Sequence, residues 1–184
     1  AARLALPGLV RQEGLFLVSG RPALVSGLVR GADLTRVVKR GPLRPAYAAA
    51  IIHAAATTLD AAVRAKGLVH GHLGPRRILM TAFGEVRIAG MGLNPDDERA
   101  QSNPIGSEDR SRVRYTSPER TMFGEMSSED DVYSLGAILS LLLTGTWPMR
   151  PGGTSEAHAV AVSELAGRVR GGTPEGAETL AKIV

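Results

Sequence analysis

The fold is decided by two neighbouring stretches of sequence, LVHGHLGPRRILM at residues 68–80 and GEVRIAGMGL at residues 84–93. The first stretch contains a short apolar run at 78–80, and in the second, at 85–88, apolar residues alternate with charged ones. A turn signal that ends in glycine separates the two runs at residues 82–84. The pattern predicts two short strands joined by a tight turn.

Two long helices are predicted, one on each side of these strands. Pro45 opens an alanine-rich helix over about residues 46–66, because proline lacks the N–H group that would be unpaired in a first turn. Gly67 ends this helix, as a glycine just beyond the last turn often does. The second helix begins at the acidic run 128–131 and is apolar on all sides through Leu143, which indicates burial on most faces.

The remaining segments are shorter or less regular. Apolar stretches at 9–18 and 23–29 flank a turn signal and predict a hairpin, and residues 33–39 predict a short helix. Residues 93–114 are polar and charged, and a loop of this length inside a domain is usually functional or disordered. Two helical patterns follow between residues 156 and 184.

Composition limits the class of protein. The chain has 184 residues, of which 43% are apolar and 22% charged, and this favours one globular domain. The absence of cysteine excludes disulfides, zinc–thiolate sites, iron–sulfur clusters and a catalytic thiol. The net charge is +4, but only 4% of the residues are aromatic, too few for the stacking surfaces of single-strand binders. We expect no nucleic-acid partner, and a salt-dependent nucleic-acid binder is a minor alternative.

The sequence also bears on location. The longest apolar stretch, residues 135–143, is about half of the roughly 18–20 residues that a membrane span needs, so we expect no membrane span in this segment. No signal-peptide pattern is present. The alanine- and arginine-rich composition suggests a bacterial, cytoplasmic protein. The chain starts and stops abruptly, and we expect it to be a fragment of a longer protein.

Four motifs follow one another in a fixed order. They are the two stretches at 68–80 and 84–93, YTSPE at 115–119 and DVYSLG at 131–136. In the same order and at the same intervals they resemble H-R-D-L-K-P-x-N-I-L-L, G-x-V-K-I-x-D-F-G-L, Y-M-A-P-E and D-V-W-S-L-G. These are the catalytic loop, the magnesium loop, the end of the activation segment and the start of a buried helix in the eukaryotic-type (Ser/Thr) protein kinase family. The resemblance covers nearly all of the chain and is least secure after about residue 150.

The positions that carry the chemistry in that family are altered here. The resemblance places His72 at the catalytic acid, and Arg77 and Gly90 at the Asn and Asp that hold magnesium. Gly74 replaces the lysine that steadies the transferring phosphoryl group, and Gly71 replaces the arginine that precedes the acid. Loss of one general base typically lowers a rate by about 10²–10⁴. We therefore expect no catalytic residue among these positions and no bound metal.

Part of an adenine site is an open alternative. The resemblance places Val29 in the linker whose backbone meets adenine, Asp33 where an acid often meets the ribose, and Leu79 under the adenine ring. Each residue also has an ordinary role, as a linker, a helix N-cap or a core leucine. Arg77 either pairs with nucleotide phosphates in place of magnesium or fills the vacated space. We expect no cofactor, with ATP bound without magnesium as the alternative.

The other histidines suggest little chemistry. His53 lies on the alanine-rich helix and is expected to be a core or groove residue. His70 and His72 have the spacing of a metal pair on a strand, but no third ligand is evident. Phosphorylation near the arginines of the 93–114 loop would order that loop, and unmodified polar residues are the alternative.

The fold expected is mainly α (α+β), a protein-kinase-like C-lobe with a residual N-lobe β-hairpin. Residues 1–184 would form one partial domain, with the last N-lobe strands and the hinge at 1–29 and the C-lobe at 30–184. The resemblance implies an inactive pseudokinase that serves as a regulatory or scaffolding module in signalling and binds a protein partner. The alternative is a divergent serine/threonine kinase that transfers the ATP γ-phosphate to protein hydroxyls. Exposed apolar residues would make the isolated chain prone to aggregate, around Leu15, Leu17 and Leu24.

Overall fold

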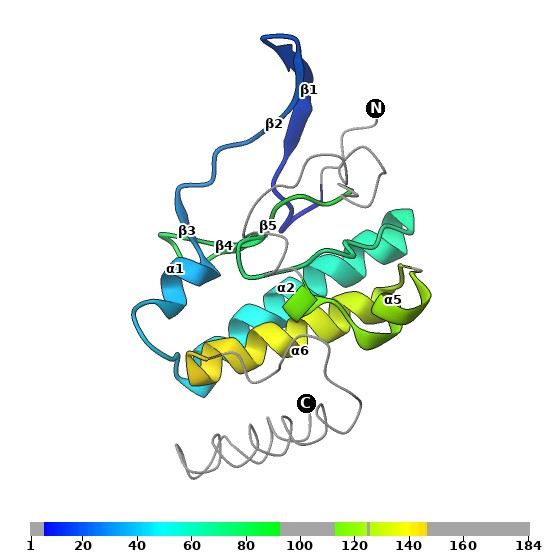
Figure 1. Cartoon of the computed structure of the whole chain (residues 1–184). Coiled ribbons are helices and arrows are strands. Elements are labelled where there is room, and N and C mark those ends of the chain that lie inside the picture. Colours follow the sequence, from blue (N-terminus) through cyan, green and yellow to red (C-terminus); the bar gives the residue numbers. More distant parts are fainter. Residues whose placement is uncertain (1–5, 93–112, 125, 147–184) are drawn as a thin grey trace.

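The first sheet is a hairpin that projects away from the rest of the molecule (Figure 1). In the computed structural model, which describes residues 6–92, 113–124 and 126–146, it consists of β1 (Gln12–Val18) and β2 (Arg21–Ser26). The strands are antiparallel, and the predicted hairpin is confirmed. Leu15 and Leu17 are 71% and 78% exposed, as expected, whereas Leu24 is half-buried.

The second sheet has the order β3 (Gly31–Asp33), β4 (Ile78–Thr81) and β5 (Val86–Ile88), with antiparallel neighbours. The strands β4 and β5 were predicted and β3 was not. A Cβ atom on Gly31 would lie 1.9 Å from the carbonyl oxygen of Met80, so only glycine allows β3 to approach β4 this closely. At the other edge, Ile88 exchanges backbone hydrogen bonds of 2.8 and 2.7 Å with Val10 and Gly8.

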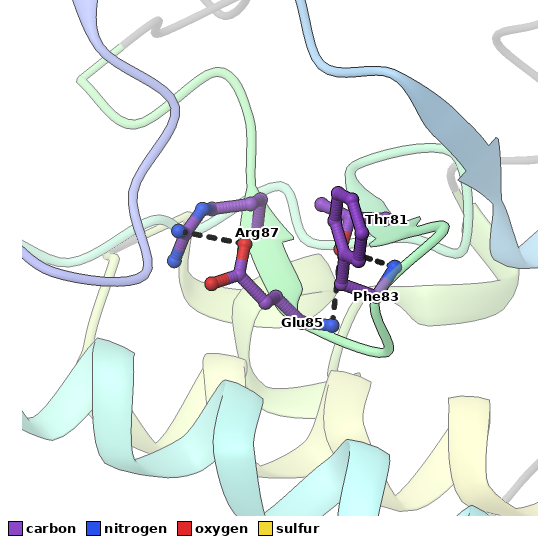
Figure 2. Close-up of polar contacts among 4 residues, drawn as sticks. All are labelled: Thr81, Phe83, Glu85 and Arg87. Carbon is purple, nitrogen blue, oxygen red and sulfur yellow. Dashed lines mark hydrogen bonds and ion pairs between the residues drawn. The ribbon is translucent and has the colours of Figure 1, made fainter.

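A tight turn joins β4 to β5 (Figure 2). The hydroxyl of Thr81 accepts hydrogen bonds from the backbone N–H groups of Phe83, at 3.3 Å, and Glu85, at 3.1 Å. The guanidinium of Arg87 pairs with the Glu85 carboxylate at 3.1 Å. Threonine hydroxyls commonly organise turns in this way. The turn fixes the register of the two strands, and with it the relative position of the residues just outside them.

Two long helices, α2 (Pro45–Lys66) and α6 (Ser128–Thr144), lie side by side and form the body of the fold (Figure 1). Both were predicted, as was the short α1 (Leu34–Val38). A left-handed glycine ends each long helix, Gly67 at φ 63° and Gly145 at φ 68°.

The core lies between α2, α6 and the second sheet. One face of α2 is buried because its inward residues recur every three or four positions. The fully or nearly fully buried members of the core include Leu34, Ile51, Leu59, Leu73, Ile78, Ile88, Ile138 and Leu142. His53 lies on the opposite face of α2 and is exposed, so its expected core position was wrong. The described part of the chain is mixed α+β.

Two short elements precede α6 that were not predicted. They are the 3₁₀ turn η1 (Val113–Tyr115) and the helix α5 (Pro118–Phe123). The side chain of Ser117 caps α5 and Pro118 is its first residue, which is a local signal for a helix start. The loop was expected at 93–114, but Val113 and Arg114 belong to η1. The rest of that loop and the helices expected between 156 and 184 lie outside the described residues.

One described helix, α2, is long and apolar enough by length and composition to cross a membrane, which the sequence analysis did not expect. Length and composition are weak grounds for a membrane span, because the core helix of a soluble protein passes the same test. In this fold α2 contributes Ile51, Ala55 and Leu59 to the core against α6.

Candidate functional site

The loop between α2 and β4 is anchored to the start of α6. Both carboxylate oxygens of Asp131 accept hydrogen bonds of 2.8 Å, one from the backbone N–H of His70 and one from that of Gly71. Asp131 is only 3% exposed, and this burial raises the pKa of its carboxyl although the two N–H donors favour the charged form. Two charge-assisted bonds between segments 60 residues apart therefore fix the backbone of the loop.

His70 connects this loop to the end of β5. Its Nε2 lies 3.1 Å from the carbonyl oxygen of Ala89, and its Nδ1 lies 3.3 Å from the backbone nitrogen of His72. A carbonyl only accepts and a backbone N–H only donates, so the ring carries its proton on Nε2 and accepts at Nδ1. Burial lowers the pKa of His70 and holds the ring in this neutral form. His70 is thus a structural residue.

A buried arginine from α5 contacts the same loop. Arg120 is 7% exposed; its Nη1 donates to the carbonyl oxygen of Gly71, and its Nη2 lies 3.0 Å from Nε2 of His72. Because a guanidinium only donates, Nε2 of His72 accepts this bond and is not available to take up another proton. The backbone N–H of Arg120 donates to the hydroxyl of Ser117 at 3.1 Å, and that hydroxyl donates to Asp130 of α6. The Arg120 side chain is therefore held by the loop, and the start of its helix is tied to α6 through Ser117.

The space beside Gly71 is also filled. A Cβ atom at this position would lie 1.9 Å from Sδ of Met126 and 2.9 Å from Nη1 of Arg120. The backbone of Gly71 is left-handed, with φ at 68°, which disfavours any larger residue. A side chain at position 71 is therefore incompatible with the observed positions of Met126 and Arg120.

A second arginine fills the space beside Gly90. A Cβ atom on Gly90 would lie 2.7 Å from Nη1 and 3.1 Å from Cζ of Arg77. The strand register explains this proximity: Arg77 precedes β4, Gly90 follows β5, and the backbone N–H of Ala89 donates to the carbonyl of Arg77 at 2.8 Å. The two positions are neighbours across the sheet, and the guanidinium of one lies against the backbone of the other.

The third glycine of the loop is in more open surroundings. At Gly74 the nearest atom to a Cβ would be Cδ2 of Tyr115 at 3.7 Å, an ordinary van der Waals contact. Gly74 therefore accepts a side chain without rearrangement, in contrast to Gly71 and Gly90.

Known proteins with similar sequences decide the family. A family model described as protein tyrosine and serine/threonine kinase matches residues 2–173. This chain belongs to the protein kinase family. The serine/threonine-protein kinase PknH of Mycobacterium bovis is 34% identical over 151 residues, which are 82% of this chain and 25% of that protein. PknD of Mycobacterium tuberculosis is 32% identical over 154 residues, which are 82% of this chain and 22% of that protein. PknL of the same species is 35% identical over 128 residues, which are 69% of this chain and 32% of that protein.

The chain spans about a quarter of the length of the kinases PknH and PknD that it matches. In a protein kinase domain, magnesium is held by an Asn and an Asp, whose positions the motif comparison assigns to Arg77 and Gly90. Magnesium does not fit the residues present, since one of these positions has no side chain and the other places a cation there. Among the described residues, no group of three His, Asp or Glu side chains lies together as a metal site would require.

The three residues considered for adenine and ribose lie on or near β3 and β4. Asp33 and Leu79 are partners across the two strands, and Val29 lies in the linker before β3. Leu79 is half-buried, and its neighbours in β4, Ile78 and Met80, point to the core, so Leu79 lies on the opposite face of the sheet. The structure thus brings Asp33 and Leu79 together across the two strands, with Leu79 on the face away from α2 and α6.

Asp33 also has a structural role. Its carboxylate caps α1 by accepting the backbone N–H of Arg36 at 3.0 Å and the hydroxyl of Thr35. Burial opposes the charged form, but these two hydrogen bonds and the charge of Arg36 lower the pKa of Asp33. The N-cap role considered from the sequence is present.

Two residues of the site were missed in the sequence. Arg120 and Met126 reach Gly71 from positions about fifty residues later in the chain, and no motif indicates such a contact. His70 and His72 were assigned correctly to the same loop, but the second is paired with an arginine.

Proposed function

We propose that this domain is a pseudokinase: it keeps the scaffold of the protein kinase family, transfers no phosphate, and acts as a regulatory or scaffolding module that binds a protein partner in signalling. Family membership supports the scaffold. The contacts of two arginines with the altered catalytic positions support the loss of catalysis.

The observation that carries this proposal is that the domain's own cations occupy the altered positions. Arg77 lies against Gly90, where the family holds magnesium. Arg120 donates to His72, where the family has the acid that orients the substrate hydroxyl. A magnesium ion would meet the positive charge of Arg77. The imidazole of His72, which replaces the base, already accepts a hydrogen bond from Arg120. Each change removes a separate requirement of phosphoryl transfer.

The anchoring contacts support retention of the scaffold. Asp131 holds the loop backbone through two hydrogen bonds, and His70 links the loop to the end of β5. Both contacts keep the loop ordered and neither takes part in phosphoryl transfer. A domain that only binds partners still requires a stable surface, and these bonds provide it.

The experiment is a phosphotransfer assay on the full natural protein. It would be incubated with radiolabelled ATP, with magnesium or manganese, and with a general protein substrate, beside the His72→Ala variant as a matched control. We expect equal background incorporation in both proteins. Incorporation by the natural protein that His72→Ala abolishes would overturn the proposal and establish the alternative, a divergent serine/threonine kinase.

A second candidate is nucleotide binding without magnesium, and Arg77 favours it. Its guanidinium can pair bidentately with phosphate oxygens and would supply the charge that the metal supplies elsewhere. The residues proposed to meet the nucleoside are Asp33 and Leu79, which are partners across β3 and β4, and Val29, which lies in the linker before β3. A cytoplasmic location is also part of the proposal, tested by fractionation of cells that express the full protein.

A further inference from the structure

A row of exposed cations follows α1 and the loop that leads to α2. It consists of Arg36, Lys39, Arg40 and Arg44, hereafter the basic strip, and all four residues are exposed. No acidic residue occurs in the sequence between Asp33 and Asp60. Within the ranges that the structure describes, none of the four makes an ion pair.

Some arginines elsewhere in the described chain have acidic partners. Three of them pair with a glutamate or aspartate two or four residues away, and these pairs are Arg11–Glu13 at 3.2 Å, Arg64–Asp60 at 2.9 Å and Arg87–Glu85 at 3.1 Å. The carboxylate of Asp33, which precedes the basic strip, is used to cap α1. Asp33 is the one acidic residue next to the basic strip, and it acts on Arg36. Lys39, Arg40 and Arg44 are like charges with no acidic residue beside them in the sequence.

The backbone under the basic strip is held in place. Leu43 donates to the carbonyl of Leu142 in α6 at 2.7 Å, and two further backbone bonds of 3.1 and 2.9 Å turn the chain after α1. The apolar residues between the cations, Val37, Val38 and Leu43, pack against the core. The cations are therefore presented outward from an ordered support, which lowers the entropy lost when a partner binds.

The chemistry of the basic strip favours an acidic polypeptide. Three of its four cations are arginines, whose planar forks match carboxylates bidentately. A membrane surface is less suitable, because attraction of cations to anionic lipid is strengthened by apolar side chains that enter the bilayer, and here those side chains pack against the core. A single-stranded nucleic acid would require several aromatic residues for stacking or a longer row of cations. Tyr47 is one exposed aromatic residue near the basic strip, and a single ring is too little for such a surface.

We propose that the basic strip is a docking surface for an acidic segment of a partner protein, rich in aspartate and glutamate. This inference rests on the proposed function, in that a domain acting by binding needs such a surface, and it names the class of partner. It does not involve the loop that contains His72 and Arg77.

The test uses the full natural protein and a short fluorescent polyglutamate peptide, with fluorescence anisotropy as the readout. The variant is Lys39→Glu, Arg40→Glu and Arg44→Glu together. The matched control reverses three other exposed arginines, Arg21, Arg30 and Arg114, and changes the net charge equally. We expect affinity to fall about tenfold or more in the variant and to change little in the control. Binding should also weaken with added salt.

Three results would overturn the inference: no binding of the polyglutamate peptide by the natural protein, equal losses in variant and control, or tighter binding to phosphatidylserine vesicles or duplex DNA than to the peptide. Circular dichroism of each variant shows that it is folded, and Lys39→Gln, Arg40→Gln and Arg44→Gln provide a milder set if charge reversal unfolds the domain. The phosphotransfer assay on the same preparation reports on the proposed function separately, so failure of either proposal is recognised by itself.

Discussion

The Nη2 atom of Arg120 lies 3.0 Å from Nε2 of His72, so a buried guanidinium from α5 contacts the side chain that the motif comparison assigns to the catalytic acid of the kinase family. This contact has a consequence for attempts to restore activity. A carboxylate introduced at position 72 would meet a fixed cation before it met a substrate hydroxyl.

We predict that His72→Asp restores no phosphotransfer. The new carboxylate would pair with Arg120, and the ion pair would lower its basicity and cover it. The measurement is γ-phosphate incorporation by the full natural protein that carries His72→Asp. The same assay on His72→Asp with Arg77→Asn and Gly90→Asp should also stay at background. Incorporation that depends on the introduced aspartate would contradict the account of Arg120.

Asp131 should contribute strongly to stability. In Asp131→Asn, one carboxylate oxygen becomes an NH2 group, which cannot accept a hydrogen bond. The backbone N–H of His70 or of Gly71 then loses its acceptor, and we expect a loss of about 2 kcal/mol in the free energy of unfolding. The measurement is denaturant unfolding. Asp60→Asn is the matched control, because its pair with Arg64 is exposed and worth at most about 0.5 kcal/mol. Equal losses in the two variants would show that the anchoring bonds are weak.

The contact between Arg77 and Gly90 can be measured as a coupling energy. Gly90→Ala should cost about 2–3 kcal/mol, from the left-handed backbone at φ 84° and from the clash with Arg77. Gly84→Ala measures the backbone contribution alone, because Gly84 has φ 81° and no atom within 4 Å of its Cβ position. This substitution should cost about 1 kcal/mol.

In an Arg77→Ala background the clash is absent, so Gly90→Ala should cost no more than Gly84→Ala. A double-mutant cycle of unfolding free energies gives the difference, which we expect to be about 1–2 kcal/mol. Strict additivity of Arg77→Ala and Gly90→Ala would mean that the two residues are not in contact.

Acid should destabilise the domain through His70. Its pKa in the folded state lies below the ordinary 6.5, so the unfolded chain takes up the proton first, and stability falls as the pH drops below about 6.5. The raised pKa of Asp131 acts in the opposite direction at more acidic pH. Unfolding midpoints between about pH 7.5 and pH 5.5 measure the slope. His70→Gln should flatten this slope.

Much of the fold could be predicted from the sequence, since the helix signals at Pro45, Gly67 and Gly145 are local and the structure follows them. The helix α5 was missed although Ser117 and Pro118 are a usable signal, because six residues give no periodicity. The strand β3 was missed because its three residues are defined only by their pairing with β4. The exposure of His53 depends on which face of an alanine-rich helix meets α6, and the small side chains of that helix leave this ambiguous.

The site was predictable only in part. The motifs located the altered positions His72, Gly74, Arg77 and Gly90 along the chain. The sequence left open whether Arg77 meets nucleotide phosphates or fills the vacated space. The β4–β5 register brings its guanidinium beside Gly90. The contact of Arg120 with His72 joins segments 48 residues apart and depends on the orientation of α5. Such contacts follow from packing, which no single stretch of sequence contains.

Exposed apolar residues on the β1–β2 hairpin should govern the solubility of residues 1–184. Leu15→Ser with Leu17→Ser should reduce light scattering on warming and leave the melting temperature unchanged, because both side chains are already mostly exposed. Val132→Ser is a control at a similarly exposed residue of α6. A chain of residues 1–184 that is monomeric and melts sharply without these substitutions would contradict the expectation.

The central claim is that Arg77, and not magnesium, supplies positive charge at the family's metal position. Thermal unfolding of the full natural protein with ATP, with and without magnesium, tests it most directly. A ligand at about 100 times its dissociation constant stabilises the native state by about 2.7 kcal/mol, which is readily measured. The account predicts that magnesium adds nothing to any shift that ATP produces, and that Arg77→Ala removes such a shift. A stabilisation by ATP that appears only with magnesium and survives Arg77→Ala would contradict it.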